Sequence, residues 1–204
     1  MQNIRSKLEN RTRDFIRDQV ITEYAVLLPL IKKQGVLCVL FERRSNSLRG
    51  QPGEICFPGG STEPGDMDTC DTAIRETCEE LGLKRADIEI FGPLDILLTS
   101  YQLKIYPYVG KIREEAAITP NSCEVDEAFF IPLDFFLTTK PYMTMVKIHL
   151  QPEPDFPFQL IPNGKEYHWK QGNYPVYFYE YENYKIWGIT ARILYNFIEI
   201  ISTV

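Results

Sequence analysis

The sequence predicts one α+β or α/β-layered domain in which an antiparallel or mixed sheet lies between helices. Its 204 residues are 44% hydrophobic and 25% charged, the usual composition of a single globular domain. The apolar runs 24–31 and 35–41 have the composition of buried strands, whereas 71–82 and 189–201 have the apolar spacing of helices. No internal repeat or linker interrupts the chain, so we expect residues 1–204 to form one domain.

The first expected elements are a helix and a hairpin. Apolar side chains recur at helical spacing in the charged segment 4–18, which predicts an amphipathic helix. The strand-like runs YAVLLPLI at 24–31 and GVLCVLF at 35–41 are joined by the polar turn 32–34. This order predicts a β-hairpin with at least one well-buried strand.

The middle of the chain is expected to combine a functional loop with a helix. Residues 42–69 are rich in glycine, proline and arginine, and a turn-rich stretch of that length in a compact domain is usually functional or disordered. The helix predicted over 71–82 ends at Gly82, a residue suited to the left-handed C-cap position.

Strand-like segments follow this helix. Three of them are predicted, at 87–99, 103–112 and 129–136. Residues 140–180 are rich in proline, tyrosine and phenylalanine, which indicates further strands and turns. A last helix is expected over 189–201, where apolar and polar residues alternate at helical spacing.

The charge balance excludes several classes of function. The chain has 28 acidic and 22 basic residues and a net charge of −6, so it lacks the attraction to phosphate polymers of a general DNA- or RNA-binding protein. No apolar run approaches the roughly 20 residues of a membrane span. The N-terminal sequence MQNIRSKLENRTRDF has no apolar signal-peptide core. We therefore expect a soluble, cytoplasmic protein.

Cysteine and histidine usage narrows the chemistry further. The five cysteines are an odd number and no two form a CxxC pair, so neither a disulfide framework nor a four-thiolate zinc site is indicated. With His149 and His168 as the two histidines, a three-histidine zinc centre is excluded. The chemistry must therefore come from carboxylates and arginines.

The segment 72–82 carries the strongest functional signal. On a helical wheel, Glu76, Glu79 and Glu80 fall on one side and the apolar residues on the other. Like charges three and four residues apart repel, so water, an arginine or a cation must offset them. One interpretation is a solvated acidic face; the other is a site for a hard divalent ion. The glycine-rich loop 57–60 favours the second, because it can bring backbone carbonyls close to the helix.

This helix and the residues before it resemble the Nudix box. The stretch GSTEPGDMDTCDTAIRETCEELGL at 60–83 has a glycine, an acidic residue and then R-E-hydrophobic-x-E-E-x-G-hydrophobic. Thr77 stands at a hydrophobic position, and Asp66 replaces the expected glutamate and lies nine residues before Arg75 instead of eight. The matching residues are Arg75, Glu76, Glu79, Glu80, Gly82 and Leu83.

The extra residue in the box is typical of the coenzyme A diphosphatase branch, which the upstream sequence also resembles. That branch has the pattern L-L-T-x-R-S-x-x-x-R-x-x-x-G-x-x-x-F-P-G-G. Phe41 and Glu42 are the departures, in place of leucine and threonine. The matching residues are Leu40, Arg44, Ser45, Arg49, Gly53 and FPGG at 57–60, with shorter matches at 25–27, 121–133 and WGITA at 187–191.

The resemblance implies a fold and a reaction. The fold would be the Nudix α/β/α sandwich with a mixed central sheet. The reaction would be hydrolysis of the diphosphate of coenzyme A, or of its oxidised or acyl forms, to 3′,5′-ADP and 4′-phosphopantetheine. By the same resemblance, Glu76 and Glu80 are the leading ligands for Mg²⁺ or Mn²⁺ and Glu79 a third, and Glu76 would also orient or deprotonate the attacking water.

Further site residues follow from the resemblance. For Arg44, Ser45 and Arg49 the resemblance implies phosphate binding, because a guanidinium can bind two phosphate oxygens. Composition alone allows a solvated basic turn at these residues equally well. Arg75 would pair with a carboxylate of the box, and Glu124 or Glu127 lies where some Nudix enzymes have a downstream base or extra ligand. The substrate-binding set would be Arg44, Ser45, Arg49, Gly59 and Gly60.

Two other functions compete with this one. The departures at Phe41 and Glu42 leave room for ADP-ribose, another nucleoside diphosphate derivative or a dinucleoside polyphosphate as the substrate. A non-catalytic Nudix module that binds a nucleotide or a protein is the third hypothesis, which the intact arginine and glutamate set disfavours. Residues 140–180 are expected to form either a substrate lid or a dimer surface, so a homodimer is one expected assembly.

Overall fold

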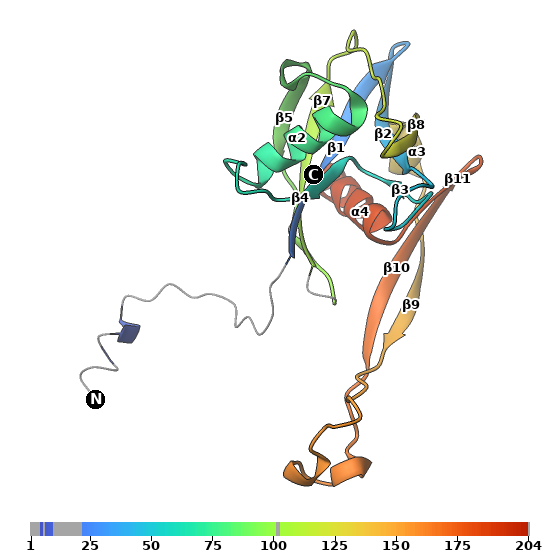
Figure 1. Cartoon of the computed structure of the whole chain (residues 1–204). Helices are drawn as coiled ribbons and strands as arrows, with labels where there is room; N and C mark the ends of the chain where they lie inside the picture. The colour runs from blue at the N-terminus through green and yellow to red at the C-terminus, as the bar shows by residue number, and fades with distance from the viewer. Residues whose placement is uncertain (1–4, 6, 10–21, 101–102, 204) are drawn as a thin grey trace.

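The structure, a computed structural model, describes residues 5, 7–9, 22–100 and 103–203, and consists of a layered body and a long β-hairpin arm (Figure 1). The helix expected over 4–18 lies almost entirely outside the described residues. The arm leaves the body near the start of the last helix and ends in a small knob of turns.

The body is built on a mixed sheet. Its strand order is β3-β2-β1-β7-β5, with β8 paired to β2, β4 to β1 and β6 to β7. Strands β1 and β7 are parallel, whereas the other pairs are antiparallel, so the mixed sheet is confirmed. The strands are β1 Thr22–Lys33, β2 Val36–Arg44, β3 Ile55–Cys56, β4 Gly59–Ser61, β5 Ile88–Pro93, β6 Leu97–Leu98, β7 Leu103–Ile112 and β8 Val125–Pro132.

The expected hairpin of β1 and β2 is confirmed, with its turn at Gln34 and Gly35, both at positive φ. Strand β1 reads as a continuous apolar run because both of its faces are buried. Leu27 belongs to a cluster with a residue of helix α2 (Thr69–Leu81), whereas Leu28 belongs to the cluster of helix α4 (Gly188–Ser202). Alternate side chains of one strand therefore join the two halves of the core.

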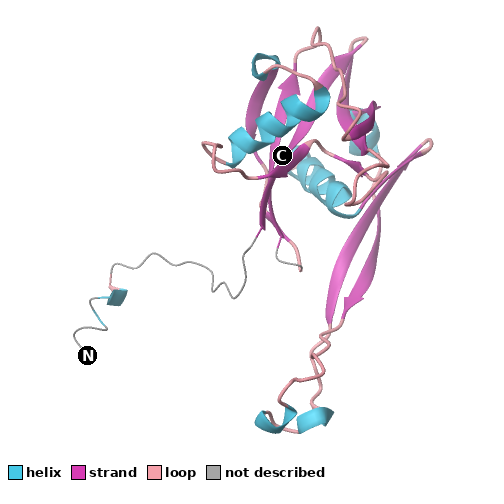
Figure 2. Cartoon of the chain, in the orientation of Figure 1, coloured by secondary structure: helices cyan, strands magenta, loops and turns pink. Residues whose placement is uncertain are grey.

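The two long helices cover opposite faces of the sheet, as Figure 2 shows. Helix α2 packs against β1, β4 and β7, and α4 adds its apolar side to the largest core cluster together with β10 and β11. The α/β/α sandwich is thus confirmed. The helix expected over 71–82 begins two residues earlier, at Thr69, because Asp68 provides its N-cap.

The strand expected over 129–136 is wrong in its second half. Strand β8 ends at Pro132, and Leu133–Thr138 form the short helix α3. Proline has no N–H to continue the ladder with β2, so the pairing ends at Pro132, which occupies the N-cap position of α3. The apolar character persists through the change because Phe136 packs into the same core as the strand.

The arm consists of β9 (Tyr142–Ile148) and β10 (Gly172–Tyr181), and β11 (Tyr184–Trp187) pairs with the base of β10. No residue of β9 is buried. Two 3₁₀ turns, Phe158–Leu160 and Gly164–Glu166, form the tip, where the rings of Phe156, Phe158, Tyr167 and Trp169 pack together. The strands and turns expected over 140–180 are thereby confirmed.

Candidate active site

Helix α2 is held at both ends by local interactions. The side chain of Asp68 accepts a hydrogen bond from the backbone N–H of Asp71 at 2.8 Å. At the other end, Gly82 has a φ of 65°, so the predicted left-handed C-cap is confirmed. A Cβ on Gly82 would lie 2.5 Å from the carbonyl oxygen of Thr119. The helix therefore presents its glutamates in a fixed orientation.

The three glutamates of α2 lie in three different environments. Glu80 is 4% exposed, and its Oε2 accepts a hydrogen bond from the N–H of Gly59 at 2.8 Å. Glu76 is half-buried and Glu79 is exposed. A single solvated acidic face is therefore wrong for Glu80. The helical wheel predicts that only the apolar side of α2 is packed. In the structure, the glycine-rich loop also covers part of the acidic side, at Glu80.

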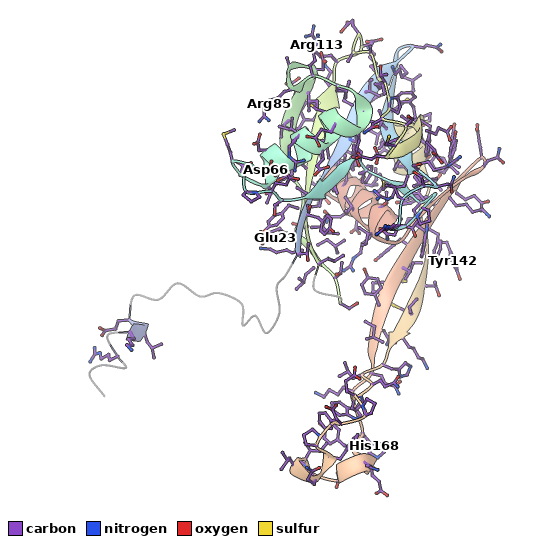
Figure 3. All side chains as sticks on the ribbon, viewed as in Figure 1. Glu23, Asp66, Arg85, Arg113, Tyr142 and His168 are labelled. Carbon is purple, nitrogen blue, oxygen red and sulfur yellow. The ribbon has the colours of Figure 1, made fainter. Side chains whose placement is uncertain are left out.

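Arg75 links the carboxylates of the site. Its Nε and Nη2 donate to the two oxygens of Asp66 at 2.9 and 3.1 Å, and its Nη1 donates to Glu76 at 2.9 Å and to Glu79 at 3.3 Å. Arginine is thus one of the groups that offset the repulsion, and the predicted pairing is confirmed. These bonds hold the pKa of Asp66 well below its usual range. Figure 3 shows Asp66 beside the first turns of α2.

Two glycines let this segment lie close to β1 on one side and to helix α2 on the other. A Cβ on Gly59 would lie 2.3 Å from a backbone oxygen of β1, and a Cβ on Gly60 would lie 2.3 Å from the carboxyl carbon of Glu76. The sequence predicted that backbone carbonyls of this loop lie close to the helix. The carbonyl of Pro58 instead accepts a hydrogen bond from the N–H of Leu27 in β1. The loop offers the helix an N–H group, that of Gly59.

Glu42 on β2 is a second buried carboxylate, which sequence reasoning treated only as a departure from a motif. It is 0% exposed; the thiol of Cys56 donates to its Oε1 at 3.3 Å, and its Oε2 has no hydrogen-bond partner among the described residues. Burial raises the pKa of Glu42, and burial together with the charge of Glu42 raises the pKa of Glu80. The available signal was a single acid directly after the apolar run 35–41.

The predicted substrate residues separate into two groups. Arg44 and Gly59 line a cleft of about 570 Å³, and the Nε of Arg44 donates to the carbonyl of Gly50 at 3.3 Å. Ser45 is buried in the turn, where its hydroxyl bonds that of Ser47 at 2.9 Å. Gly60 faces Glu76 and Arg49 is exposed, and neither lines the cleft.

The two candidate downstream acids also differ in position. Glu124 lies near the carboxylate of Glu76: burial raises the pKa of Glu76, and the charge of Glu124 adds to this increase. Glu127 is occupied instead, by the guanidinium of Arg43 at 3.1 Å and the hydroxyl of Tyr184 at 2.8 Å. The charge of Glu124 therefore acts on Glu76 of α2 and on Glu42 of β2.

The cleft beside Gly59 is formed mainly by apolar side chains. They come from β1, β7, the end of β11, α4 and the segment between β3 and β4, which are far apart in the sequence. Charged and polar groups enter it at Arg44, Gln51 and Glu54. Its apolar lining consists of Tyr24, Val26, Phe57, Leu103, Ile105, Trp187, Ile189 and Ile193.

Comparison with known proteins identifies the family, because the NUDIX domain model matches residues 22–148. The chain belongs to the Nudix family. It is 32% identical over 177 residues to the peroxisomal coenzyme A diphosphatase NUDT7 of Mus musculus, covering 84% of this chain and 66% of the mouse protein. It is 38% identical over 119 residues to the mitochondrial coenzyme A diphosphatase NUDT8 of Homo sapiens, covering 57% of this chain and 50% of that protein.

A solved structure agrees on the fold. The MutT/nudix family protein from Enterococcus faecalis matches with a TM-score of 0.51 at 12% identity, over 99% of this chain and 69% of that one. The Nudix resemblance and its coenzyme A diphosphatase branch are confirmed by the two relatives. This Nudix chain spans about two thirds of the mouse relative and half of the human one.

Family membership makes the chain a hydrolase of pyrophosphate bonds, and Nudix hydrolases generally need divalent metal ions such as Mg²⁺ or Mn²⁺. The donor chemistry fits such an ion, because the site combines buried carboxylates with an oxygen of Glu42 that has no hydrogen-bond partner in the described part of the chain. Within the described ranges, no three histidine, cysteine, aspartate or glutamate side chains are already grouped as a ligand set. None of the described helices has the length and apolar character of a membrane span.

Proposed function

We propose that this Nudix chain hydrolyses the diphosphate linkage of coenzyme A, or of its oxidised or acyl forms, to 3′,5′-ADP and 4′-phosphopantetheine. The observation that carries the proposal is the joined upstream motif and Nudix box in a chain similar to two coenzyme A diphosphatases. The placement of Arg44 supports it, since this guanidinium lines the cleft beside Gly59 and can bind two phosphate oxygens.

Mg²⁺ or Mn²⁺ would be held by Glu76 and Glu80, with Glu79 as the third ligand. When bound, such an ion would screen the phosphate charge and acidify the attacking water. Glu80 suits the role because its raised pKa reflects burial beside another acid, a condition that a cation relieves. Glu79, exposed and bonded to Arg75, is the least constrained of the three.

The chain's own residues would position the reacting groups. The N–H of Gly59 fixes one oxygen of Glu80 at 2.8 Å, and Arg75 orients Glu76 and Glu79. We propose Glu124 rather than Glu127 as the downstream acid that accepts the proton of water, because Glu127 is already bonded to Arg43 and Tyr184.

The first test is hydrolysis of coenzyme A by the purified full chain with Mn²⁺, with both products identified by mass. In Glu80→Gln, kcat/KM should fall by roughly a thousandfold, since removing a metal ligand costs several kcal/mol of transition-state stabilisation. Glu89→Gln, an exposed charge on β5, should leave it unchanged. Equal turnover in both variants would contradict the metal role, and no product from wild type would contradict the substrate.

An alternative substrate is ADP-ribose or another nucleoside diphosphate derivative. It is favoured by one specific observation: Glu42, where the branch motif has threonine, is buried beside the site. A substrate panel decides between the two, and coenzyme A should have the highest kcat/KM. The cytoplasmic location stays a prediction, since the two named relatives are peroxisomal and mitochondrial.

A further inference from the structure

The motif Trp187-Gly188-Ile189-Thr190-Ala191 has no part in the reaction as described so far. It spans the junction where β11 ends at Trp187 and α4 begins at Gly188. Its first four residues line the cleft, whereas Ala191 is fully buried in the core. The hydroxyl of Thr190 donates to the carbonyl of Ile55 at 3.2 Å, so this group joins α4 to β3. The motif therefore forms one wall of the cleft.

Trp187 is the large aromatic side chain of that wall. Phe178 stacks on it from β10, with the rings 14° from parallel and their centroids 6.1 Å apart. Tyr142 of β9 stands next to Phe178 in turn, at 6.1 Å, so three rings cross three strands. This row holds the indole in place, yet Trp187 remains 45% exposed. A rigid indole supported on one face and partly open in a cleft can stack with a planar ring.

The remaining lining decides which half of the substrate fits. Val26, Ile105 and Ile193 present apolar walls to the same cleft. The pantetheine half is a flexible chain with amide groups, and burying an amide without a hydrogen-bond partner is costly. Adenine offers two flat faces and carries its polar groups on its edge, so it can stack without burying them. Arg44, in the same cleft, supplies a cation for the phosphates attached to such a nucleoside.

We propose that Trp187 is the stacking platform for the adenine ring of the substrate, so that the cleft takes the nucleotide half of coenzyme A. This inference rests on the proposed function in that the substrate is an adenine nucleotide derivative. Trp187 thereby determines specificity for the substrate by stacking on its base, and it takes no part in the chemical step. The base of the arm supports this platform, because β9 and β10 supply the two rings next to the indole, Tyr142 and Phe178.

The chain has two tryptophans, and this allows a direct test. Trp169 lies at the arm tip, packed against Phe156 and Tyr167. In Trp169→Phe, Trp187 is the only indole, and its fluorescence should be quenched in a saturable manner by 3′,5′-ADP in metal-free buffer. The matched control Trp187→Phe reports from Trp169 and should show no change. 4′-Phosphopantetheine should leave the emission of Trp187 unaltered.

Kinetics provide the second measurement. Trp187→Ala should raise KM for coenzyme A roughly tenfold with a smaller effect on kcat, as expected when base stacking is lost, and Trp187→Phe should restore most of the affinity. Quenching by 4′-phosphopantetheine but not by 3′,5′-ADP would overturn the inference, and so would no quenching by either in a protein that hydrolyses coenzyme A. Quenching by adenine nucleotides without coenzyme A hydrolysis would overturn the proposed substrate alone.

Discussion

The surroundings of helix α2 and the β9–β10 arm differ in which side chains they bury and which they expose. Around α2, carboxylates are buried or paired: Glu80 with a backbone N–H and Asp66 with Arg75. On the arm, large apolar side chains such as Tyr142 and Met145 are exposed. Figure 3 places Tyr142 near the arm base and His168 at the tip, well away from Asp66.

The difference shows that side chains are more restricted near α2 than on the arm. Burial and close contacts near α2 restrict Glu80, Glu76 and Asp66, and such restriction is the condition for positioning reacting groups. A two-stranded hairpin with no buried strand residue in β9 has few contacts to lose. Equivalent substitutions should therefore have large effects in the body and small effects on the arm.

The largest expected effect is on stability. Phe136, 1% exposed, packs against Phe41 and Tyr179, so Phe136→Ala should lower the free energy of unfolding by about 3–5 kcal/mol. Phe156→Ala, in the aromatic cluster of the tip, should cost no more than about 1 kcal/mol. Urea denaturation measures both. Equal losses would show that the arm and the body unfold as one unit.

The next effect is on catalysis. A Cβ on Gly60 would overlap the carboxyl group of Glu76, so Gly60→Ala should displace that carboxylate and lower kcat about a hundredfold. The control is Gly172→Ala on the arm, where the new Cβ meets Ile148 at an ordinary 3.6 Å. Its turnover should match wild type. An unaffected Gly60→Ala would mean that Glu76 does not need its observed position.

The third effect is a pH dependence of stability. The pKa values of Glu42 and Glu80 are raised in the folded state, to about 7 and about 9, so the folded protein holds these protons more tightly than the unfolded chain. With a metal chelator present, their contribution is complete below about pH 4.5 and is lost as the pH rises toward 9. Tm should therefore fall from pH 5 to pH 9.

Two controls sharpen this experiment. Glu80→Gln should flatten the decline, and added Mn²⁺ should oppose it, because a bound cation compensates the buried charges. Asp66 has a lowered pKa and acts in the opposite direction, but only below its ordinary value of 3.8, outside the window. A decline of the same slope in Glu80→Gln would assign the pH dependence to other groups.

The smallest effect is expected at the arm tip. Replacing residues 149–171 by an Asn-Gly turn keeps the pairing of Ile148 with Gly172 and should shift Tm by less than about 2 °C. Turnover of coenzyme A should stay within twofold. A tenfold loss would identify the tip as the substrate lid, and a change of mass in sedimentation would identify it as a dimer surface. Both remain predictions from the sequence.

Much of the fold was predictable because its signals are local. The β1–β2 hairpin follows from two apolar runs around a polar turn, and α2 follows from its periodicity and from Gly82. The failure at 133–136 has a local cause as well: apolar residues after Pro132 suit a strand or a buried helix equally. Within the site, spacing predicted the shared face of the three glutamates of α2, and the Nudix resemblance predicted the pairing of Arg75 with a carboxylate of the box.

The sequence by itself determined which groups are available: carboxylates at helical spacing, an arginine among them and glycines in the loop before them. Only the tertiary structure decided how each is used. It buried Glu80 and left Glu79 exposed, brought Glu42 beside Glu80, and formed the cleft at Trp187 from distant strands and a helix. Periodicity describes one element and its nearest neighbours, whereas burial and charge coupling depend on which other elements pack against it.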